Sequence, residues 1–321
     1  MAREARREGG RLIASTPAPS SPPRPPSQGL PFVPAAGFVL VWSSGYIAGP
    51  YGVAAVSPLS LVAGRFVLAA VLAGLLAWAL RRPLRVTRDD AIRIALAGFM
   101  LNGVQFGAMY LAFDAGLGAT LASLMHSLSP VLTAVLAAAF LRERLSVRQM
   151  LGFVVGVVGV MLVLGPDIEG AGGTAGVVWG VIGVLGLSFG TLGQRWIGHA
   201  PDPYWSATIQ FGVSAVPLTL LALSLEGTDV VTDPAAGVFA LIYLAVVNSI
   251  LGLALLGILV RARGAGAASS IFFLMPPVTA VLAWLILGET LNLREVLGLM
   301  IAVVGVAAAT RGTGVNRVTT G

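Results

Sequence analysis

Apolar residues run along this chain in ten long stretches that short polar segments separate. Each stretch is close to the roughly 20 mostly apolar residues that a helix needs to cross a bilayer. The pattern therefore predicts an all-α integral membrane protein with ten transmembrane helices. The first five are expected at residues 34–50, 58–80, 94–113, 117–140 and 148–165, and the second five at 174–194, 203–225, 236–260, 265–287 and 290–310.

Residues 1–33 follow a different pattern, rich in proline, serine and arginine and poor in apolar positions. Such a segment has too little apolar surface to bury, so we expect a disordered N-terminal tail. It also lacks the apolar stretch and the small-residue cleavage site of a signal peptide.

Arginine indicates the orientation of the chain, because cytoplasmic loops of membrane proteins collect positive charge. Basic residues occupy the N-terminal tail, the loops around 81–88, 142–148, 195 and 261–263, and the C-terminal tail 311–321. The alternate loops are neutral or acidic, and Arg294 is the one exception. Both tails are therefore expected in the cytoplasm, with the protein in the inner (cell) membrane.

One stretch of sequence occurs twice. "LRERLSVRQMLGFVVGVVGV" at 141–160 resembles "LGETLNLREVLGLMIAVVGV" at 287–306, which aligns Glu143 with Glu289 at an offset of 146 residues. Five spans lie within that interval, and an odd number of crossings turns the second copy upside down. Inverted repeats of this kind are typical of transporters, so we expect two five-helix repeats at 34–165 and 174–310.

Composition excludes several other classes of protein. The chain is 56% hydrophobic and 11% charged, with a mean hydropathy of +0.89, whereas soluble domains carry about 25% charged residues. The absence of cysteine excludes disulfides and zinc–sulfur sites, and the absence of lysine excludes a phosphate-binding P-loop. Arginine-rich cytoplasmic loops account for the high pI, so nucleic acid is not an expected partner. No cofactor and no metal site are expected.

Several motifs resemble a known family. Two five-helix halves, each with a proline-bearing fourth helix that ends in an "LxE" corner, are similar to the drug/metabolite transporter superfamily. "VWSSGYIAGP", the "GRF" of the second span and "LGETL" match its EamA-type permeases, although "LRERL" stands where that family more often has "LGERL". The resemblance covers about residues 34–310. It implies ten helices, cytoplasmic termini and export or exchange of small metabolites such as amino acids, without implying one substrate.

Two prolines lie near the middle of repeat-related spans. Pro130 and Pro276 each remove a helical hydrogen bond, and the freed carbonyls would belong to His126 and Phe272. Freed carbonyls at mid-membrane are tolerated against protein or a water-filled cavity. We expect these two kinks to flank a central substrate cavity; the alternative is that they only shape helix packing.

Titratable side chains inside the spans are few. Arg65 is the one arginine placed inside a span, where it could bind a substrate carboxylate, snorkel to the surface, or pair with Asp114 or with a helix C-terminus. His126 could carry a proton or could simply be a hydrogen-bonded packing residue. No acidic residue lies near the centre of a span, so a carboxylate-based ion site at mid-membrane is not expected.

Polar and aromatic side chains at mid-span complete the candidate site. The expected substrate-binding set is Trp42, Ser43, Ser44, Arg65, Gln105, His126, Tyr243, Asn248, Phe272 and Phe273, with Asn102, Tyr110, Ser188, Trp205 and Gln210 as further candidates. Glu143 and Glu289 are expected at helix ends, each capping the N-terminus of the next helix; a role in gating is the alternative.

The function that these features favour is secondary transport of a small metabolite across the cytoplasmic membrane by alternating access, as an exporter or exchanger. Import is an open alternative, and so are proton coupling, passive exchange and a homo-oligomer. A lipid-modifying membrane enzyme would need clustered acidic, histidine or nucleophilic groups, and the two histidines, His126 and His199, lie at different expected depths. A receptor or scaffold would not require polar groups at mid-membrane.

Overall fold

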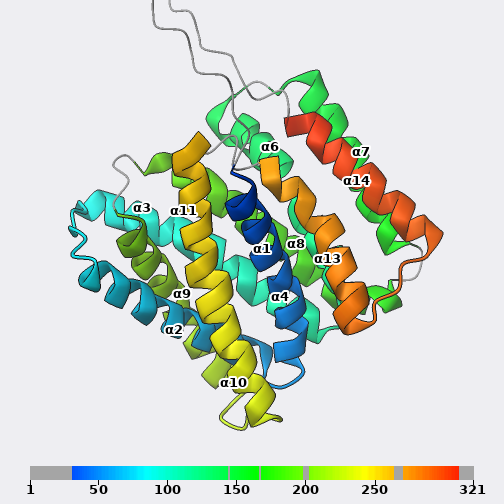
Figure 1. Ribbon diagram of the computed structural model, residues 1–321. Helices are drawn as coiled ribbons and strands as arrows, with labels where there is room; N and C mark the ends of the chain where they lie inside the picture. Colours follow the sequence, from blue (N-terminus) through cyan, green and yellow to red (C-terminus); the bar gives the residue numbers. More distant parts are fainter. Residues whose placement is uncertain (1–30, 144, 166–167, 198–201, 264–269, 311–321) are drawn as a thin grey trace, which may run out of the picture.

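The computed structural model describes residues 31–143, 145–165, 168–197, 202–263 and 270–310 (Figure 1). This part of the chain is nearly all helical, and its β-structure is limited to one antiparallel bridge between Val56 and Val231. The expected disordered tail and the C-terminal tail lie almost entirely outside the described residues. The first helix begins at Phe32, two residues before the expected span.

Ten helical units follow one another along the described chain. The first five are α1 (Phe32–Val53), α2 (Pro58–Ala79), α3–η1–α4 (Arg88–Gly98, Phe99–Val104 and Gln105–Asp114), α5–α6 (Ala119–Ser127 and Ser129–Leu141) and α7 (Val147–Leu164). A short turn η2 (Glu169–Ala171) leads to α8 (Gly173–Gly193) with η3 (Gln194–Trp196), and then to α9 (Pro203–Leu225). The last three are α10–η4–α11 (Pro234–Ile242, Tyr243–Leu251 and Gly252–Arg263), η5–α13–η6 (Ser270–Leu274, Met275–Leu282 and Ala283–Leu287) and α14 (Leu293–Thr310).

The length and composition of these helices fit a bilayer. Eight of the described helices are long and apolar enough to span a membrane, and residues 271–287 form a shorter apolar helix. Large apolar side chains such as Leu75, Val158 and Leu220 are exposed on the outside of the bundle, as lipid contact requires. The expected fold class, an all-α membrane protein made of two repeats, is confirmed.

Helices α7 and α14 show the inverted relation directly, because they are repeat-related and pack antiparallel. Gly152 near the start of α7 lies against Gly305 and Ala309 near the end of α14, and Gly159 lies against Gly298 and Ala302. A Cβ at Gly159 would collide with backbone atoms of α14, so glycine is what permits this close approach. Repeat-related α2 and α9 pair in the same way at the opposite side of the molecule (Figure 1).

Two repeat-related arginines lie at the ends of the α7–α14 pair, each beside the C-terminus of the other helix. Arg148 Nε donates to the Ala308 carbonyl at the C-terminus of α14, at 2.9 Å. The Arg294 guanidinium lies over Gly165, the C-cap of α7, whose φ of +68° suits glycine. A positive side chain at a helix C-terminus is stabilised by the helix dipole. This local role accounts for Arg294, the one arginine that broke the charge pattern of the loops.

The remaining helices form two groups of three. Bundle A consists of α1, α10–η4–α11 and η5–α13–η6, which lie side by side on the near side of Figure 1. Bundle B consists of α3–η1–α4, α5–α6 and α8, which also pack on one another. Each bundle combines helices from both sequence repeats. The inverted repeat relates one bundle to the other. The α2–α9 and α7–α14 pairs flank them.

Candidate functional site

A cavity of about 520 Å³ lies between the two bundles and the α2–α9 pair. Its walls are mainly apolar and aromatic, with a few polar side chains. They include Trp42, Tyr46, Arg65, Asn102, Gln105, Phe106, Met109, Tyr110, Phe113, His126, Gln194, Ser206, Gln210, Phe211, Asn248, Ser249, Leu253 and Leu256. An apolar hollow with a few convergent polar groups is the usual form of a small-molecule site.

The cavity extends to one face of the molecule. Gln194 and Ile197 line it from the α8–α9 connection, and Ser206 and Gln210 line it from the first turns of α9. The same face carries Arg82, Arg195 and other loop arginines, and we call it the arginine-rich face. The side-chain amide of Gln194 donates through Nε2 to the side-chain oxygen Oε1 of Gln210 at 3.1 Å, which places a polar rim at this mouth.

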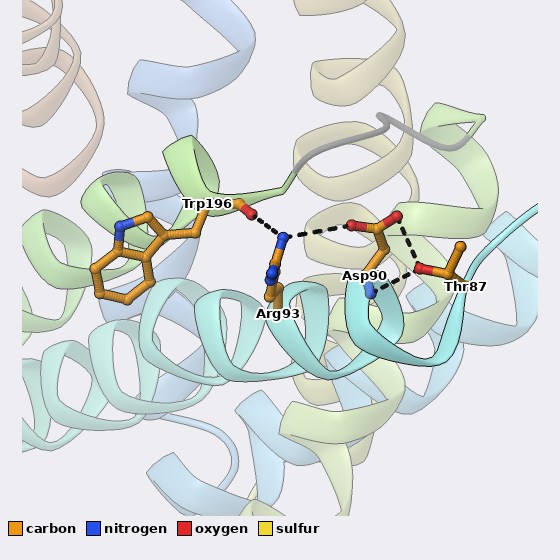
Figure 2. Close-up of polar contacts among 4 residues, drawn as sticks. All are labelled: Thr87, Asp90, Arg93 and Trp196. Carbon is orange, nitrogen blue, oxygen red and sulfur yellow. Dashed lines mark hydrogen bonds and ion pairs between the residues drawn. The ribbon is translucent and has the colours of Figure 1, made fainter.

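A polar cluster supports the mouth from outside (Figure 2). Arg93 of α3 donates to the Trp196 carbonyl at 3.0 Å and lies 3.9 Å from the Asp90 carboxylate. Asp90 accepts from the Thr87 hydroxyl, and Thr87 caps α3 by accepting from the Asp90 amide. The cluster ties the end of η3 to bundle B, next to the lining residues Gln194 and Ile197.

Arg65 lies at the inner end of the cavity, on α2, and is only 5% exposed. Its Nε donates to the Ser249 hydroxyl and its Nη1 donates to the Tyr110 hydroxyl, both at 3.1 Å. The guanidinium carbon lies 4.4 Å from the centre of the Phe106 ring, within cation–π range. Asp114 is exposed, and no ion pair joins Arg65 to any acidic residue in the described ranges.

His126 joins the two bundles at the cavity wall. Its Nδ1 is 2.7 Å from the Tyr46 hydroxyl, which comes from α1 of bundle A. Its Nε2 is buried and has no hydrogen-bond partner among the described residues. The ring is therefore held by one hydrogen bond between bundles and keeps one nitrogen free.

Wide π-helical turns occur at matching places in the third and eighth helices. η1 and η4 are related by the 146-residue offset, and each presents an asparagine, Asn102 or Asn248, to the cavity. Their amide groups donate to main-chain carbonyls, of Gly98 for Asn102 and of Val41 for Asn248. Such turns are rare and occur often at functional sites.

The opposite face carries Glu226 and Glu289, and we call it the acidic face. Contacts between the two bundles close the cavity on this side. The Glu289 carboxylate, at the end of bundle A, accepts from the amides of Ala119 and Thr120 at 2.6 and 3.2 Å and from the Thr120 hydroxyl at 2.8 Å. These donors form the N-terminus of α5 in bundle B. Nearby, the Phe113 ring covers Gly49 of α1 and leaves no room for a Cβ there.

A second carboxylate closes the same face within the α2–α9 pair. Glu226, the C-cap of α9, accepts from the amides of Leu59 and Ser60, both at 2.8 Å, and from the Ser60 hydroxyl at 2.7 Å. A carboxylate at a helix N-terminus satisfies free amides and meets the positive end of the helix dipole.

The cavity brings together half of the expected substrate-binding residues: Trp42, Arg65, Gln105, His126 and Asn248. The further candidates Asn102, Tyr110 and Gln210 line it too, whereas Ser188 and Trp205 do not. Pro130 and Pro276 each lie in the first turn of a new helix, α6 or α13, where the preceding helical segment ends. Of the carbonyl-bearing residues expected beside them, His126 lines the cavity and Phe272 does not.

The other five expected residues have different contacts. Ser43 is directed to the Met275 carbonyl, and the hydroxyls of Ser44 and Tyr243 bond each other at 2.8 Å. Phe272 packs against Phe38 and Trp42, and Phe273 packs in an apolar cluster around Val131 and Val306. Helix rotation decides which side chains face inward, and the polar character of a residue alone does not reveal it.

The two helix-end glutamates also differ from the expectation that each caps the helix that follows it. Glu289 caps α5, whereas Asn292 and Glu295 provide the cap of α14. Glu143 lies exposed, 3.4 Å from Arg195, and the N-terminus of α7 is capped by Ser146 with Gln149. The nearest helix in sequence already had its own cap, so each glutamate was free for another partner.

Sequence reasoning missed several lining residues, among them Tyr46, Phe106, Phe113 and Ser249. Aromatic residues are common in membrane spans, so three of these carried no distinguishing signal. Ser249 follows Asn248 directly, and a search for polar residues at the 146-residue offset from Asn102 would have led to this pair.

Comparisons with known proteins agree with this architecture. The model of the EamA-like transporter family matches residues 32–165 and again 174–311. A probable amino-acid metabolite efflux pump of Salmonella typhimurium is 26% identical over 280 residues, which cover 83% of this chain and 90% of that protein. A probable terminal-alkyne amino-acid exporter of Streptantibioticus cattleyicolor is 29% identical over 292 residues, covering 86% and 91%.

A solved crystal structure shares the fold, with a TM-score of 0.60 and 19% identity over 87% of this chain and 96% of that one. The resemblance to the drug/metabolite transporter superfamily is confirmed, and the family is one of transporters, not of enzymes. The chain is a multi-pass membrane protein that belongs to the EamA-like transporter family.

Proposed function

We propose that this transporter moves small metabolites such as amino acids out of the cytoplasm, as an exporter or exchanger that works by alternating access. The observation that carries the proposal is the central cavity. It lies between two inverted bundles, reaches the arginine-rich face and is closed towards the acidic face. A site at the interface of inverted repeats, accessible from one side at a time, is the arrangement that such carriers need.

The names of the relatives support amino acids and the outward direction. One is named as a probable efflux pump for amino-acid metabolites and another as a probable exporter of a terminal-alkyne amino acid. The cavity is also of suitable size, since small-molecule sites occupy about 300–1,000 Å³.

The distribution of arginine supports an inner-membrane protein with both termini in the cytoplasm. In this orientation the mouth formed by Gln194, Ser206 and Gln210 faces the cytoplasm. The described conformation is then the one that accepts substrate from inside, as the first step of export requires.

We further propose that alternation moves bundle A against bundle B. Opening the acidic face would break the contact of Glu289 with α5 and lift Phe113 from Gly49. Among the described residues, the repeat-related Glu143 lies exposed beside Arg195 at the arginine-rich face.

Flux through reconstituted vesicles tests the function. Vesicles preloaded with radiolabelled apolar amino acids should release them faster with the protein than without it, and the comparison should be made with and without a pH gradient. An effect of the gradient would indicate proton coupling, and accumulation from outside would indicate import. If no small solute moves under any condition, the proposed transport is wrong.

A further inference from the structure

Arg65 carries a charge that no acidic side chain in the described part of the chain neutralises. It is 5% exposed and lies in the third turn of α2, a helix of mostly apolar residues. A charge in the membrane interior is costly unless it is paired or serves a transport pathway. Arg65 lines the cavity, so a ligand that enters the cavity can deliver the missing counter-charge.

The groups around Arg65 orient it without neutralising it. Ser249 and Tyr110 accept from two of its N–H groups through neutral hydroxyls, and Phe106 supports the guanidinium plane. No hydrogen bond joins Nη2 to a residue that the structure describes. A guanidinium has five N–H donors and binds a carboxylate with two parallel bonds, so donors remain for a ligand.

Among the described residues that line the cavity, Arg65 is the one charged side chain. No aspartate or glutamate is among its lining residues, so a substrate ammonium group finds only neutral acceptors there. Much of the remaining wall is apolar and comes from residues such as Trp42, Phe211, Leu253 and Leu256. One positive charge matches one carboxylate, whereas a phosphate dianion would leave net charge buried.

We infer that Arg65 binds the carboxylate of the substrate, and that the transporter recognises small monocarboxylates with an apolar body by this anion and not by an amine. The inference rests on the proposed function, since it assigns a substrate class to the same cavity. It extends that function to deaminated analogues of amino acids. It also gives Arg65 a part in coupling, because Ser249 belongs to bundle A and Tyr110 to bundle B.

Three related probes separate the carboxylate from the amine: leucine, its 2-oxo acid 4-methyl-2-oxopentanoate, and leucinamide. Each is added to the purified protein, and binding is read from the concentration that raises the midpoint of thermal unfolding. Both carboxylates should stabilise the protein at similar concentrations, and leucinamide should require at least about tenfold more. The inference would be overturned if leucinamide bound as tightly as leucine, or if neither carboxylate bound.

Substitution of the arginine is the second arm. Arg65→Gln should weaken carboxylate binding about 10- to 100-fold, as expected for the loss of charge-assisted hydrogen bonds, and Arg65→Lys should lie between it and the unchanged protein. Arg261→Gln, which removes an exposed arginine outside the cavity, is the matched control and should bind normally. Unaltered carboxylate binding by a folded Arg65→Gln protein contradicts the inference.

Flux measurements keep the two proposals apart. Binding that depends on Arg65, in a protein that moves no solute across vesicles, would reject the transport function and leave the anion site standing. The opposite result is leucine flux that leucinamide inhibits as well as 4-methyl-2-oxopentanoate does and that Arg65→Gln does not change. This result would reject the anion site and leave transport standing.

Discussion

The hydrogen bond between Tyr46 and His126 is a single-residue contact that crosses the boundary of the two bundles. It joins α1 to α5 beside the cavity, and the second ring nitrogen of His126 has no described partner. Removal of the tyrosine hydroxyl would therefore leave a buried imidazole without any hydrogen bond. Buried polar groups that lose their partner cost much more than pairs that are removed together.

A double-mutant cycle measures this contact. Tyr46→Phe should lower the free energy of unfolding by about 1–3 kcal/mol, because it leaves Nδ1 of His126 unpaired. The same substitution in a His126→Leu background should cost clearly less, since no imidazole is then left unsatisfied. Equilibrium unfolding in detergent gives the four free energies. Equal costs in both backgrounds would show that the hydrogen bond contributes nothing.

At this scale the sequence identifies residues that contrast with their surroundings. Arg65, His126 and Asn248 are polar positions in apolar spans, and all three line the cavity. Phe272 and Phe273 were expected there because they lie beside a proline, but the rotation of their helix directs them to other apolar clusters. That rotation is set by packing between distant helices, which a local pattern does not contain.

At the scale of elements, the α7–α14 contact depends on glycines that leave space for a neighbouring backbone. Gly159→Ala would place its Cβ against Ala302 N and the Gly298 carbonyl. Gly212, in α9, has nothing within 4 Å of an added Cβ. The same substitution should therefore have opposite effects at the two positions.

Thermal and chemical unfolding test this pair. Gly159→Ala should lower the free energy of unfolding by about 1–3 kcal/mol, because backbone atoms must move apart. Gly212→Ala should raise it by about 0.5–1 kcal/mol through the higher helix propensity of alanine. A stabilising Gly159→Ala would show that the two helices are not in close contact.

The two carboxylates of the acidic face should differ in function although their hydrogen bonds are alike. Glu289 joins bundle A to bundle B, whereas Glu226 joins α2 to its partner α9. Glu289→Gln should weaken closure of the acidic face by about 1–2 kcal/mol, because glutamine presents an NH₂ group to helix amides and loses the charge.

Accessibility of a cavity cysteine reads this change. With Met109→Cys as the reporter, Glu289→Gln should increase labelling from the acidic face, and Glu226→Gln should not, although it also lowers stability. Equal labelling in both variants would mean that Glu289 does not hold the gate. The reporter is clean because the chain has no cysteine of its own.

Most elements could be predicted from the sequence, because ten apolar stretches have the length of a membrane crossing. The breaks before α6 and α13, whose first turns hold Pro130 and Pro276, also follow from local chemistry. The π-helical turns η1 and η4 could not be predicted, since they depend on one extra residue within an otherwise helical pattern. The caps made by Glu226 and Glu289 join residues more than 160 positions apart, beyond any local motif.

For the whole molecule, the 146-residue offset predicted the inverted arrangement, and the antiparallel α2–α9 and α7–α14 pairs display it. The division into two bundles that mix helices of both repeats was not predicted. It arises because α1 packs with α11 and α13, while α8 packs with α3, α4 and α6. The two bundles and the two sequence repeats therefore do not coincide in this fold.

Cross-linking of the acidic face tests most directly whether bundle A and bundle B must separate during transport. Gly118→Cys with Glu289→Cys places one thiol on each bundle. In the unmodified protein the Glu289 carboxylate lies against Gly118. Val56→Cys with Val231→Cys is the matched control. This β-bridge on the same face joins the α1–α2 connection to the α9–α10 connection, and α1 and α10 both belong to bundle A. Both pairs receive the same short, reducible bifunctional thiol reagent.

Flux through reconstituted vesicles is then measured before cross-linking, after it and after reduction. We expect the cross-linked Gly118–Glu289 pair to lose nearly all flux and to regain it on reduction, while the Val56–Val231 pair transports throughout. Undiminished flux through a fully cross-linked Gly118–Glu289 carrier would contradict alternating access by separation of the two bundles.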